Sequence, residues 1–232
     1  MAGSGLNERK DYHLRQWQEP YRSTVHFCEF ARHHFDRSRI VFDVACGAGG
    51  ATHYLAECFP EVHFVGIDLD RELIKLAKPL PNLEFVVGDL YDLEETDHID
   101  GVVMQQSLHT LLDPIFALKK ILKSLKPKWF AASTLIYEGR IDCRIEVSEP
   151  TIGRFQNYNI IGLPLLSEAI AETYELADYQ PFEIDKDLPK PKNPNIMGTY
   201  TLKTKNSRLQ CSGPLILPWG FVMFERKHDH AD

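Results

Sequence analysis

The sequence predicts an α/β protein with a doubly wound, mostly parallel sheet. Three observations support this fold class. Several runs are apolar throughout, as in strands that are buried on both faces. These runs alternate with helical patterns of 8 to 12 residues, which is typical of right-handed crossovers between parallel strands. At 232 residues, the chain is long enough for one domain with a full core.

The first 138 residues carry this alternating pattern. A helix with one apolar face is expected from Ser23, because Phe27, Phe30, Ala31 and Phe35 have helical spacing. The helix of 114–125 begins at a proline, a natural first-turn residue, and has a continuous apolar face. The predicted strands are 40–44, 62–67, 83–87, 99–104 and 129–136, and the remaining predicted helices are 51–59 and 71–78.

The pattern breaks at Gly139. Residues 139–164 show no clear periodicity, whereas 165–177 have the spacing of a helix. A short strand is expected at 182–187, followed by a proline-rich loop. Residues 199–204 and 208–212 are predicted to form a hairpin, and 219–224 the last strand.

Composition and charge exclude several function classes. The formal net charge of −7 disfavours a general nucleic-acid binder, because phosphate backbones are bound by clustered Lys and Arg. No apolar stretch reaches the length of a membrane span. Five cysteines without a C-x-x-C spacing are typical of reduced thiols, so we expect a cytoplasmic protein that binds neither nucleic acid nor membrane. The oligomeric state stays open.

A glycine-rich turn follows the first strand and leads directly into a helix. Glycines allow close approach of a ligand to the backbone, and a helix N-terminus offers free N–H donors. Asp68 ends the next apolar run, 68 − 47 = 21 residues after Gly47, where a carboxylate can accept hydrogen bonds from ribose hydroxyls. This arrangement predicts a nucleoside-containing cofactor.

Two cofactor classes use such a turn. The dinucleotide pattern G-x-G-x-x-G fits Gly47 and Gly49, but Thr52 stands at its third position. The pattern Asp43-x-Ala45-x-Gly47-x-Gly49 instead resembles the first motif of class I S-adenosylmethionine-dependent methyltransferases. The resemblance continues in register through V-G-I-D-L-D, F-V-V-G-D-L and L-K-P-K-W-F, over residues 40–137.

The resemblance implies a Rossmann-like seven-stranded sheet with an antiparallel last strand and a small substrate-capping insertion. It implies S-adenosyl-L-methionine as cofactor, and it divides one domain into an N-terminal helical lid (1–39), a cofactor-binding core (40–138) and a capping and C-terminal part (139–232). Asp68 is the expected ribose ligand, with Asp70 as the alternate unless it only caps the helix that starts at Arg71, and Asp89 is the expected adenine ligand. The expected cofactor-binding residues are Asp43, Ala45, Gly47, Gly49, Asp68, Leu69, Asp89, Leu90, Gln105, Trp17 and Tyr21.

Three residues are candidates for catalysis. His109 follows the fourth strand, and an unperturbed histidine can accept a proton near neutral pH. His109 can equally be structural. Tyr137 and Glu138 end the fifth strand and share this candidacy. Transfer from an activated sulfonium needs mainly alignment and exclusion of water, so no metal site is expected.

The acceptor is expected to bind to residues 139–212 together with the N-terminal aromatics, which serve either as a lid or as a cover for one face of the sheet. The candidate residues are Tyr12, Arg144, Arg154, Asn157, Tyr158 and Tyr200. Their hydrogen-bonding groups favour methyl transfer to an oxygen or nitrogen of a small polar metabolite, such as a sugar or nucleotide sugar. A nicotinamide-dependent reductase and a non-catalytic cofactor-binding scaffold are the alternatives.

Overall fold

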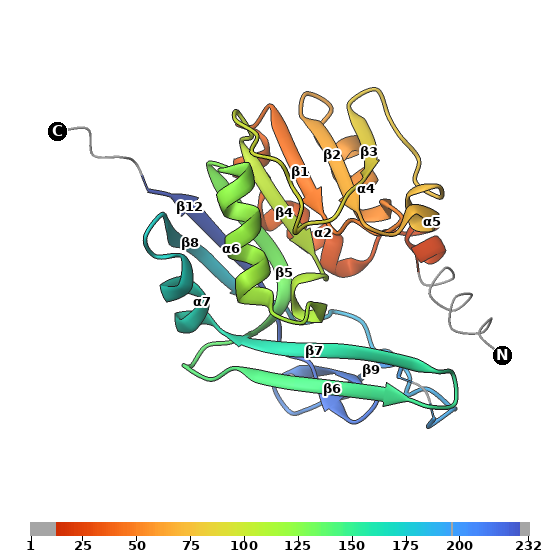
Figure 1. The fold of residues 1–232 in the computed structure, drawn as a ribbon. Helices are drawn as coiled ribbons and strands as arrows, with labels where there is room; N and C mark the ends of the chain where they lie inside the picture. The colour runs from red at the N-terminus through yellow and green to blue at the C-terminus, as the bar shows by residue number, and fades with distance from the viewer. Residues whose placement is uncertain (1–12, 196, 228–232) are drawn as a thin grey trace.

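The computed structural model describes residues 13–195 and 197–227 (Figure 1). Its main sheet has the strand order β3-β2-β1-β4-β5-β12-β8. Neighbouring strands from β3 to β5 are parallel, whereas β12 is antiparallel to both β5 and β8. This confirms the predicted fold class: seven strands, of which the last in the chain alone reverses direction.

The elements follow the chain in alternating order up to β5. The helices are α2 (Arg22–Phe30), α3 (Arg32–Phe35), α4 (Gly50–Cys58), α5 (Arg71–Ile74), η1 (Leu108–Thr110), α6 (Pro114–Leu125) and α7 (Leu163–Ile170). The strands are β1 (Ile40–Val44), β2 (His63–Asp68), β3 (Leu83–Val87), β4 (Gly101–Gln105), β5 (Trp129–Tyr137), β6 (Cys143–Glu149), β7 (Arg154–Gly162), β8 (Tyr174–Pro181), β9 (Thr199–Lys203), β10 (Arg208–Ser212), β11 (Leu215–Ile216) and β12 (Trp219–Arg226).

Two hydrophobic layers cover the sheet. On one face, α6 and α7 pack through residues such as Leu118, Ile121 and Leu166. On the other face, α2, α3 and α4 contribute Phe27, Phe35 and Leu55. Figure 1 shows α6 in front of the sheet and α2 and α4 behind it. The central strands β4 and β5 are mainly apolar because helices bury both of their faces, whereas the edge strands β3 and β8 are largely exposed.

A second structural unit lies at the carboxyl ends of the parallel strands. Strands β6 and β7 form a long antiparallel hairpin, which joins β5 through the short parallel pairing of Ile136 with Ile161. The strands β9, β10 and β11 form a separate antiparallel sheet that lies against this hairpin (Figure 1). We call the β6–β7 hairpin and this three-stranded sheet the cap.

Two local predictions were wrong. The helix predicted at 165–177 ends at Ile170, because Tyr174–Pro181 pairs with β12 as an edge strand and this tertiary pairing overrides the helical spacing. Phe182 follows that strand, so the strand predicted at 182–187 starts eight residues too late. The unassigned stretch 139–164 contains the β6–β7 hairpin.

Candidate active site

The turn after β1 has the backbone conformation that a glycine motif requires. Ala45, Gly47 and Gly49 have φ angles of 62°, 61° and 76°, in the left-handed region. A Cβ atom at Gly49 would lie 2.2 Å from the Phe85 ring, so a larger residue does not fit there. The turn therefore brings bare backbone and the first turn of α4 to one point at the sheet edge.

Asp43 lies beneath this turn and is 1% exposed. The Thr52 hydroxyl donates a hydrogen bond of 2.6 Å to Asp43 Oδ2. The Gln105 amide faces Asp43 from β4, yet neither Gln105 Nε2 nor Asp43 Oδ1 completes a hydrogen bond of ordinary geometry. Burial raises the Asp43 pKa to about 7, against the lowering effect of Thr52. Thr52, which departs from the dinucleotide pattern, thus supports the acid of the first motif.

Asp68 stands at the carboxyl end of β2 beside the same turn. Its Oδ2 accepts a hydrogen bond from the Gly47 amide at 2.7 Å, and its Oδ1 accepts one from the Asp70 amide at 2.8 Å. These two bonds fix the carboxylate plane and leave lone pairs on both oxygens. The next side chain, Leu69, is 66% exposed and offers an apolar surface beside the carboxylate.

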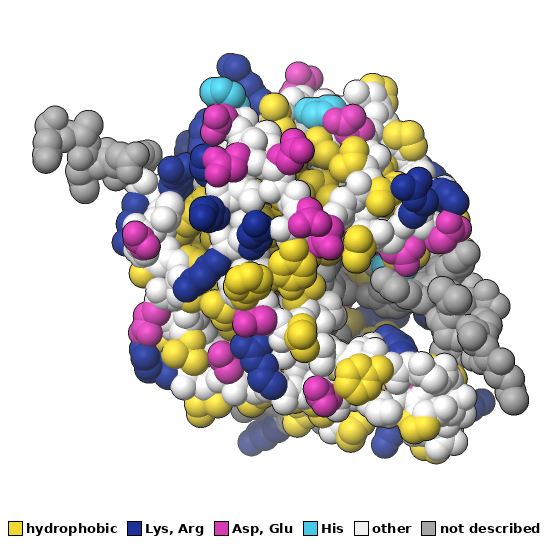
Figure 2. All heavy atoms as spheres, in the orientation of Figure 1, with side chains coloured by type: hydrophobic (Ala, Val, Ile, Leu, Met, Phe, Trp, Pro, Cys, Tyr) yellow, Lys and Arg dark blue, Asp and Glu magenta, His cyan; other side chains and the backbone are white. Residues whose placement is uncertain are grey.

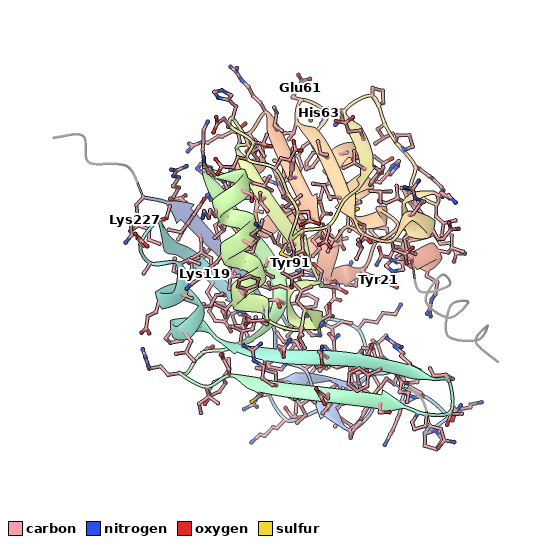
Figure 3. The ribbon with its side chains drawn as sticks, viewed as in Figure 1. Tyr21, Glu61, His63, Tyr91, Lys119 and Lys227 are labelled. Carbon is pink, nitrogen blue, oxygen red and sulfur yellow. The ribbon has the colours of Figure 1, made fainter. Side chains whose placement is uncertain are left out.

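The predicted adenine residues follow β3. Asp89 Oδ1 accepts a hydrogen bond from the Tyr91 amide at 2.9 Å, which makes a local turn. Tyr91 in turn stacks on Phe116 of α6, with 6.0 Å between ring centroids. Figure 3 shows Tyr91 beside α6. Asp89 and the half-buried Leu90 are therefore held at the same edge as Asp68.

The described N-terminal residues lie over the glycine turn. A Cβ atom at Gly47 would come within 2.5 Å of the His13 ring, and one at Gly50 within 2.8 Å of Gln16 Cβ. Trp17 packs farther out, with its ring 4.9 Å from that of His53 on α4. Tyr21 is the N-cap residue of α2. Tyr12 lies outside the described residues. The sequence interpretation missed His13 and Gln16, because neither belongs to an aromatic or apolar pattern.

The segment after β4 turns sharply at Gln106, whose φ is 56°. The Gln106 amide donates to Ser133 O at 2.8 Å, and its side chain donates to Ser23 Oγ of α2. Gln105 and His109 are thereby directed to the sheet edge from the two sides of the turn.

His109 lies in η1 and is 4% exposed. Its ring contacts the edge of Trp219 at a centroid distance of 4.8 Å and lies 5.9 Å from the Tyr158 ring. Burial lowers the His109 pKa to about 3, so the imidazole is neutral at physiological pH. A group with this pKa is a weak general base, and the structure favours a role in contact and hydrogen bonding over the expected proton acceptance.

The other candidates lie farther from this buried region. Tyr137 is 47% exposed at the end of β5. Burial, with a smaller contribution from the exposed Glu138, raises the pKa of Tyr179 on β8. Arg144 and Arg154 are on the hairpin with side chains 46% and 44% exposed, and they approach Asp142 and Glu149 at 3.9 and 3.5 Å.

The remaining acceptor candidates divide between the cap interior and its surroundings. Tyr158 is half-buried with its ring toward His109. Asn157 is half-buried on β7, next to Tyr158 in the chain. Tyr200 is buried within the three-stranded sheet, where its hydroxyl donates to Gly213 O at 3.0 Å, so it supports the cap rather than facing a ligand.

Trp219 was not predicted as a site residue. A signal for it existed: an antiparallel strand begins at the edge where its parallel neighbours end, so the first residue of β12 belongs to the site. No group of three or more His, Cys, Asp or Glu side chains within residues 13–195 and 197–227 has an arrangement suited to a metal ion. In that same part of the chain, no helix is long and apolar enough to cross a membrane.

Comparison with known proteins agrees with this geometry. Residues 41–128 match the family model described as a methyltransferase domain. A phthiotriol/phenolphthiotriol dimycocerosates methyltransferase of Mycobacterium ulcerans is 32% identical over 124 residues, which cover 50% of this chain and 45% of that protein. Trans-aconitate 2-methyltransferase of Azoarcus sp. is 30% identical over 98 residues, covering 42% of this chain and 39% of that protein. The chain thus spans less than half the length of these relatives.

Solved structures share the fold over most of the chain. The 1,6-didemethyltoxoflavin-N1-methyltransferase of Burkholderia thailandensis, solved with 1,6-didemethyltoxoflavin and S-adenosylhomocysteine, superposes with a TM-score of 0.58 at 20% identity, over 97% of this chain and 89% of that one. The glycopeptide N-methyltransferase MtfA, solved with sinefungin, gives a TM-score of 0.57 at 12% identity, over 88% and 94%.

Residues 41–128 thus match a methyltransferase domain, and the fold and motif geometry around it resemble those of class I S-adenosylmethionine-dependent methyltransferases. The residues fit the cofactor: the left-handed turn at Gly47 and Gly49 exposes backbone, Asp68 is oriented toward it, and the buried Asp43 Oδ1 lacks a partner among the described residues.

Proposed function

We propose that this protein transfers a methyl group from S-adenosylmethionine to an oxygen or nitrogen atom of a small polar metabolite. The observation that carries the proposal is that Asp68, Asp89 and the glycine turn stand at or just after the carboxyl ends of the neighbouring strands β2, β3 and β1. Figure 1 shows the cap on the side of the sheet toward which these strands run. The bound cofactor supplies an activated methyl on a sulfonium. The protein's own contribution is to hold both partners in line and exclude water.

The site residues divide into two groups in this proposal. Asp68 holds the ribose hydroxyls, Asp89 and Leu90 meet the adenine, and Leu69 and Gln105 complete the cofactor side. The cap and Tyr158 face the acceptor. The named relatives differ in acceptor, from phthiotriol/phenolphthiotriol dimycocerosates to trans-aconitate. For this chain we keep the acceptor expected from the sequence, a sugar or nucleotide sugar. We also propose a cytoplasmic location, which the five free cysteines support.

Calorimetric titration with S-adenosylmethionine and S-adenosylhomocysteine tests the cofactor side. Both should bind, and both should raise the melting temperature. At a ligand concentration of roughly 100 times the dissociation constant, the free energy of unfolding should increase by about 2.7 kcal/mol. Asp68→Ala should lose most of this affinity, since it removes the acceptor of the ribose hydroxyls.

Asp70→Ala is the matched control. Asp70 caps α5 by accepting hydrogen bonds from the amides of Glu72 and Leu73 at 2.9 and 3.3 Å. Its loss should cost about 1 kcal/mol of stability while cofactor affinity stays within a few-fold. Wild-type affinity in Asp68→Ala would refute the motif assignment. Binding without turnover on any acceptor would point to the scaffold alternative instead.

A further inference from the structure

A group of buried polar atoms without partners lies where the cap meets the sheet. His109 Nδ1, Trp219 Nε1 and Gln210 Oε1 are inaccessible at the surface and have no hydrogen-bond partner among the described residues. They come from three separate elements, η1, β12 and β10. Buried polar side-chain atoms are normally hydrogen-bonded, so a concentration of unpaired ones calls for an explanation.

These atoms belong to one cluster. His109 contacts the Trp219 ring at 4.8 Å and faces Tyr158 at 5.9 Å. The Tyr158 hydroxyl accepts a hydrogen bond from Gln156 Nε2 at 2.8 Å, and Ser212 of β10 lies close enough to influence its pKa, which burial raises. Gln210 stands two residues before Ser212 and therefore lies on the same face of that strand. The cluster thus combines aromatic surfaces with an indole donor and an amide acceptor.

Another tryptophan of the same chain shows what a satisfied indole looks like. Trp219 is half-buried with an inaccessible Nε1, whereas Trp129 is buried and its Nε1 donates a hydrogen bond of 3.0 Å to Ser38 Oγ. Leaving a buried donor unpaired costs free energy that pairing it would recover. The unpaired Trp219 N–H is therefore better explained by a ligand than by packing.

The cluster carries no charge. Its four polar members, His109, Trp219, Tyr158 and Gln210, are neutral at physiological pH, and burial keeps His109 in that form. Arg154 and the buried Glu149 both act on the Tyr158 hydroxyl, but they are paired with each other at 3.5 Å, and Arg144 approaches Asp142 at 3.9 Å, so the nearest hairpin arginines already have acidic partners. An anionic ligand would have to leave water without gaining a buried cation, which is costly.

We propose that this cluster binds the methyl acceptor as an uncharged, ring-shaped molecule. The ring would lie against Trp219 and Tyr158, a lone pair of the ligand would accept from the Trp219 indole, and a hydroxyl or N–H would donate to His109 or Gln210. This inference rests on the proposed methyl transfer but narrows its acceptor. It favours a neutral sugar or aromatic ring over a nucleotide sugar, whose phosphates have no partner here.

The test uses the full chain saturated with S-adenosylhomocysteine and two probes of equal shape, 2-naphthol and 2-naphthoate. At neutral pH the first is uncharged and the second is an anion. Calorimetry should show 2-naphthol binding at least about tenfold more tightly than 2-naphthoate, since only the neutral probe enters without an unpaired charge.

Trp219→Phe and Trp129→Phe form the variant pair. Trp219→Phe keeps an aromatic ring and removes the unpaired donor, so 2-naphthol affinity should fall by roughly fivefold or more, as expected for one lost hydrogen bond. Trp129→Phe should lower the melting temperature and leave 2-naphthol affinity unchanged.

Binding of neither probe, tighter binding of 2-naphthoate, or unchanged affinity in Trp219→Phe would each overturn the inference. Because S-adenosylhomocysteine binding is measured first on the same sample, its absence would instead count against the proposed function. The two failures are therefore distinguishable.

Discussion

Two buried ionisable residues flank the site, and their pKa values are shifted in opposite directions. The Asp43 pKa is raised from 3.8 to about 7, and the His109 pKa is lowered from 6.5 to about 3, in both cases chiefly through burial. Both residues are therefore kept closer to their uncharged forms. In both residues, burial disfavours the charged form.

These shifts predict opposite dependences of stability on pH. Between pH 3.8 and about 7, folded Asp43 holds a proton that the unfolded chain has released, so its contribution to stability is lost as pH rises. Between pH 6.5 and about 3, unfolded His109 binds a proton that the folded protein does not, so its contribution is lost as pH falls. From about pH 4 to 6.5, where both dependences act, the two slopes of stability against pH are opposite in sign and cancel.

Single variants should reveal each dependence. In Asp43→Asn, the free energy of unfolding should fall by about 1.4 kcal/mol per pH unit, relative to wild type, as pH drops from 6.5 to 4. In His109→Gln it should rise by a similar amount over that range. Urea unfolding at half-unit pH intervals gives both slopes. Identical pH profiles for the two variants would contradict the assigned shifts.

At the scale of elements, two glycine turns allow two stability costs of an added side chain to be measured separately: the cost of a left-handed backbone and the cost of a close contact. Gly49 and Gly153 both have left-handed φ angles, 76° and 65°. A Cβ at Gly49 would meet the Phe85 ring at 2.2 Å, whereas a Cβ at Gly153 would meet nothing within 4 Å. The two positions form a matched pair.

Gly153→Ala should cost about 1 kcal/mol of stability, the price of a left-handed alanine, and leave cofactor affinity unchanged. Gly49→Ala should cost roughly 2 kcal/mol more, because the Phe85 ring must move, and it should abolish S-adenosylhomocysteine binding. Thermal unfolding with calorimetric titration measures both effects. If both variants lost the same stability and kept the same cofactor affinity, the Phe85 ring would be able to move away at no cost, and the prediction would be wrong.

The elements also show how far the sequence could predict the fold. The strands that end at Val44 and Asp68 were predictable because both of their faces are largely buried. The edge strand that ends at Val87 was predictable from its apolar run, although Val86 and Val87 are 40% and 42% exposed. The end of the helix at Ile170 was not predictable, since the helical spacing continues to residue 177 and Tyr174–Pro181 becomes a strand only through its pairing with β12. The secondary-structure propensity of a segment contains no information about a partner strand that lies far away in the sequence.

The candidate site divides in the same way. Asp43, Gly47 and Asp68 lie in contiguous motifs and were predictable, although their roles as ligands remain predictions. Trp219 and His13 are brought to the site by segments distant in the chain, and no local pattern marks them. The arginines were chosen by residue type, and type alone does not tell whether a side chain points inward.

At the scale of the whole molecule, the charge is spread rather than concentrated. Figure 2 shows Lys and Arg interspersed with Asp and Glu over the face that carries α6, with hydrophobic side chains between them. The same view shows the surface hollowed between the cap and the body of the protein below β2 and β3.

The division between sheet and cap predicts that the two can be altered separately. Arg144 and Asn159 are paired in the hairpin, so residues 145–158 can be replaced by Asn-Gly, a two-residue turn that suits an antiparallel pair. The shortened protein retains the bond from Asn159 Nδ2 to Leu111 O, which fixes the segment after η1.

S-adenosylhomocysteine affinity should stay within a few-fold of wild type in this variant, because no cofactor-side residue is removed. Affinity for 2-naphthol should be lost with Tyr158. Calorimetry measures both, and circular dichroism confirms that the sheet is intact. Loss of cofactor affinity in a folded variant would show that the hairpin belongs to the cofactor site.

The points where the cap leaves and rejoins the sheet lie close together. Leu135 of β5 is paired directly with Trp219 of β12, and Tyr137 with Gly162 of β7. A segment whose ends are fixed side by side can change length at little cost, since each doubling of a loop adds only about 0.6 kcal/mol of closure entropy. Insertions and deletions in this region are therefore nearly neutral for folding. During evolution, the cap of such a protein can therefore change, and with it the proposed acceptor, while the sheet residues proposed to bind the methyl donor stay the same.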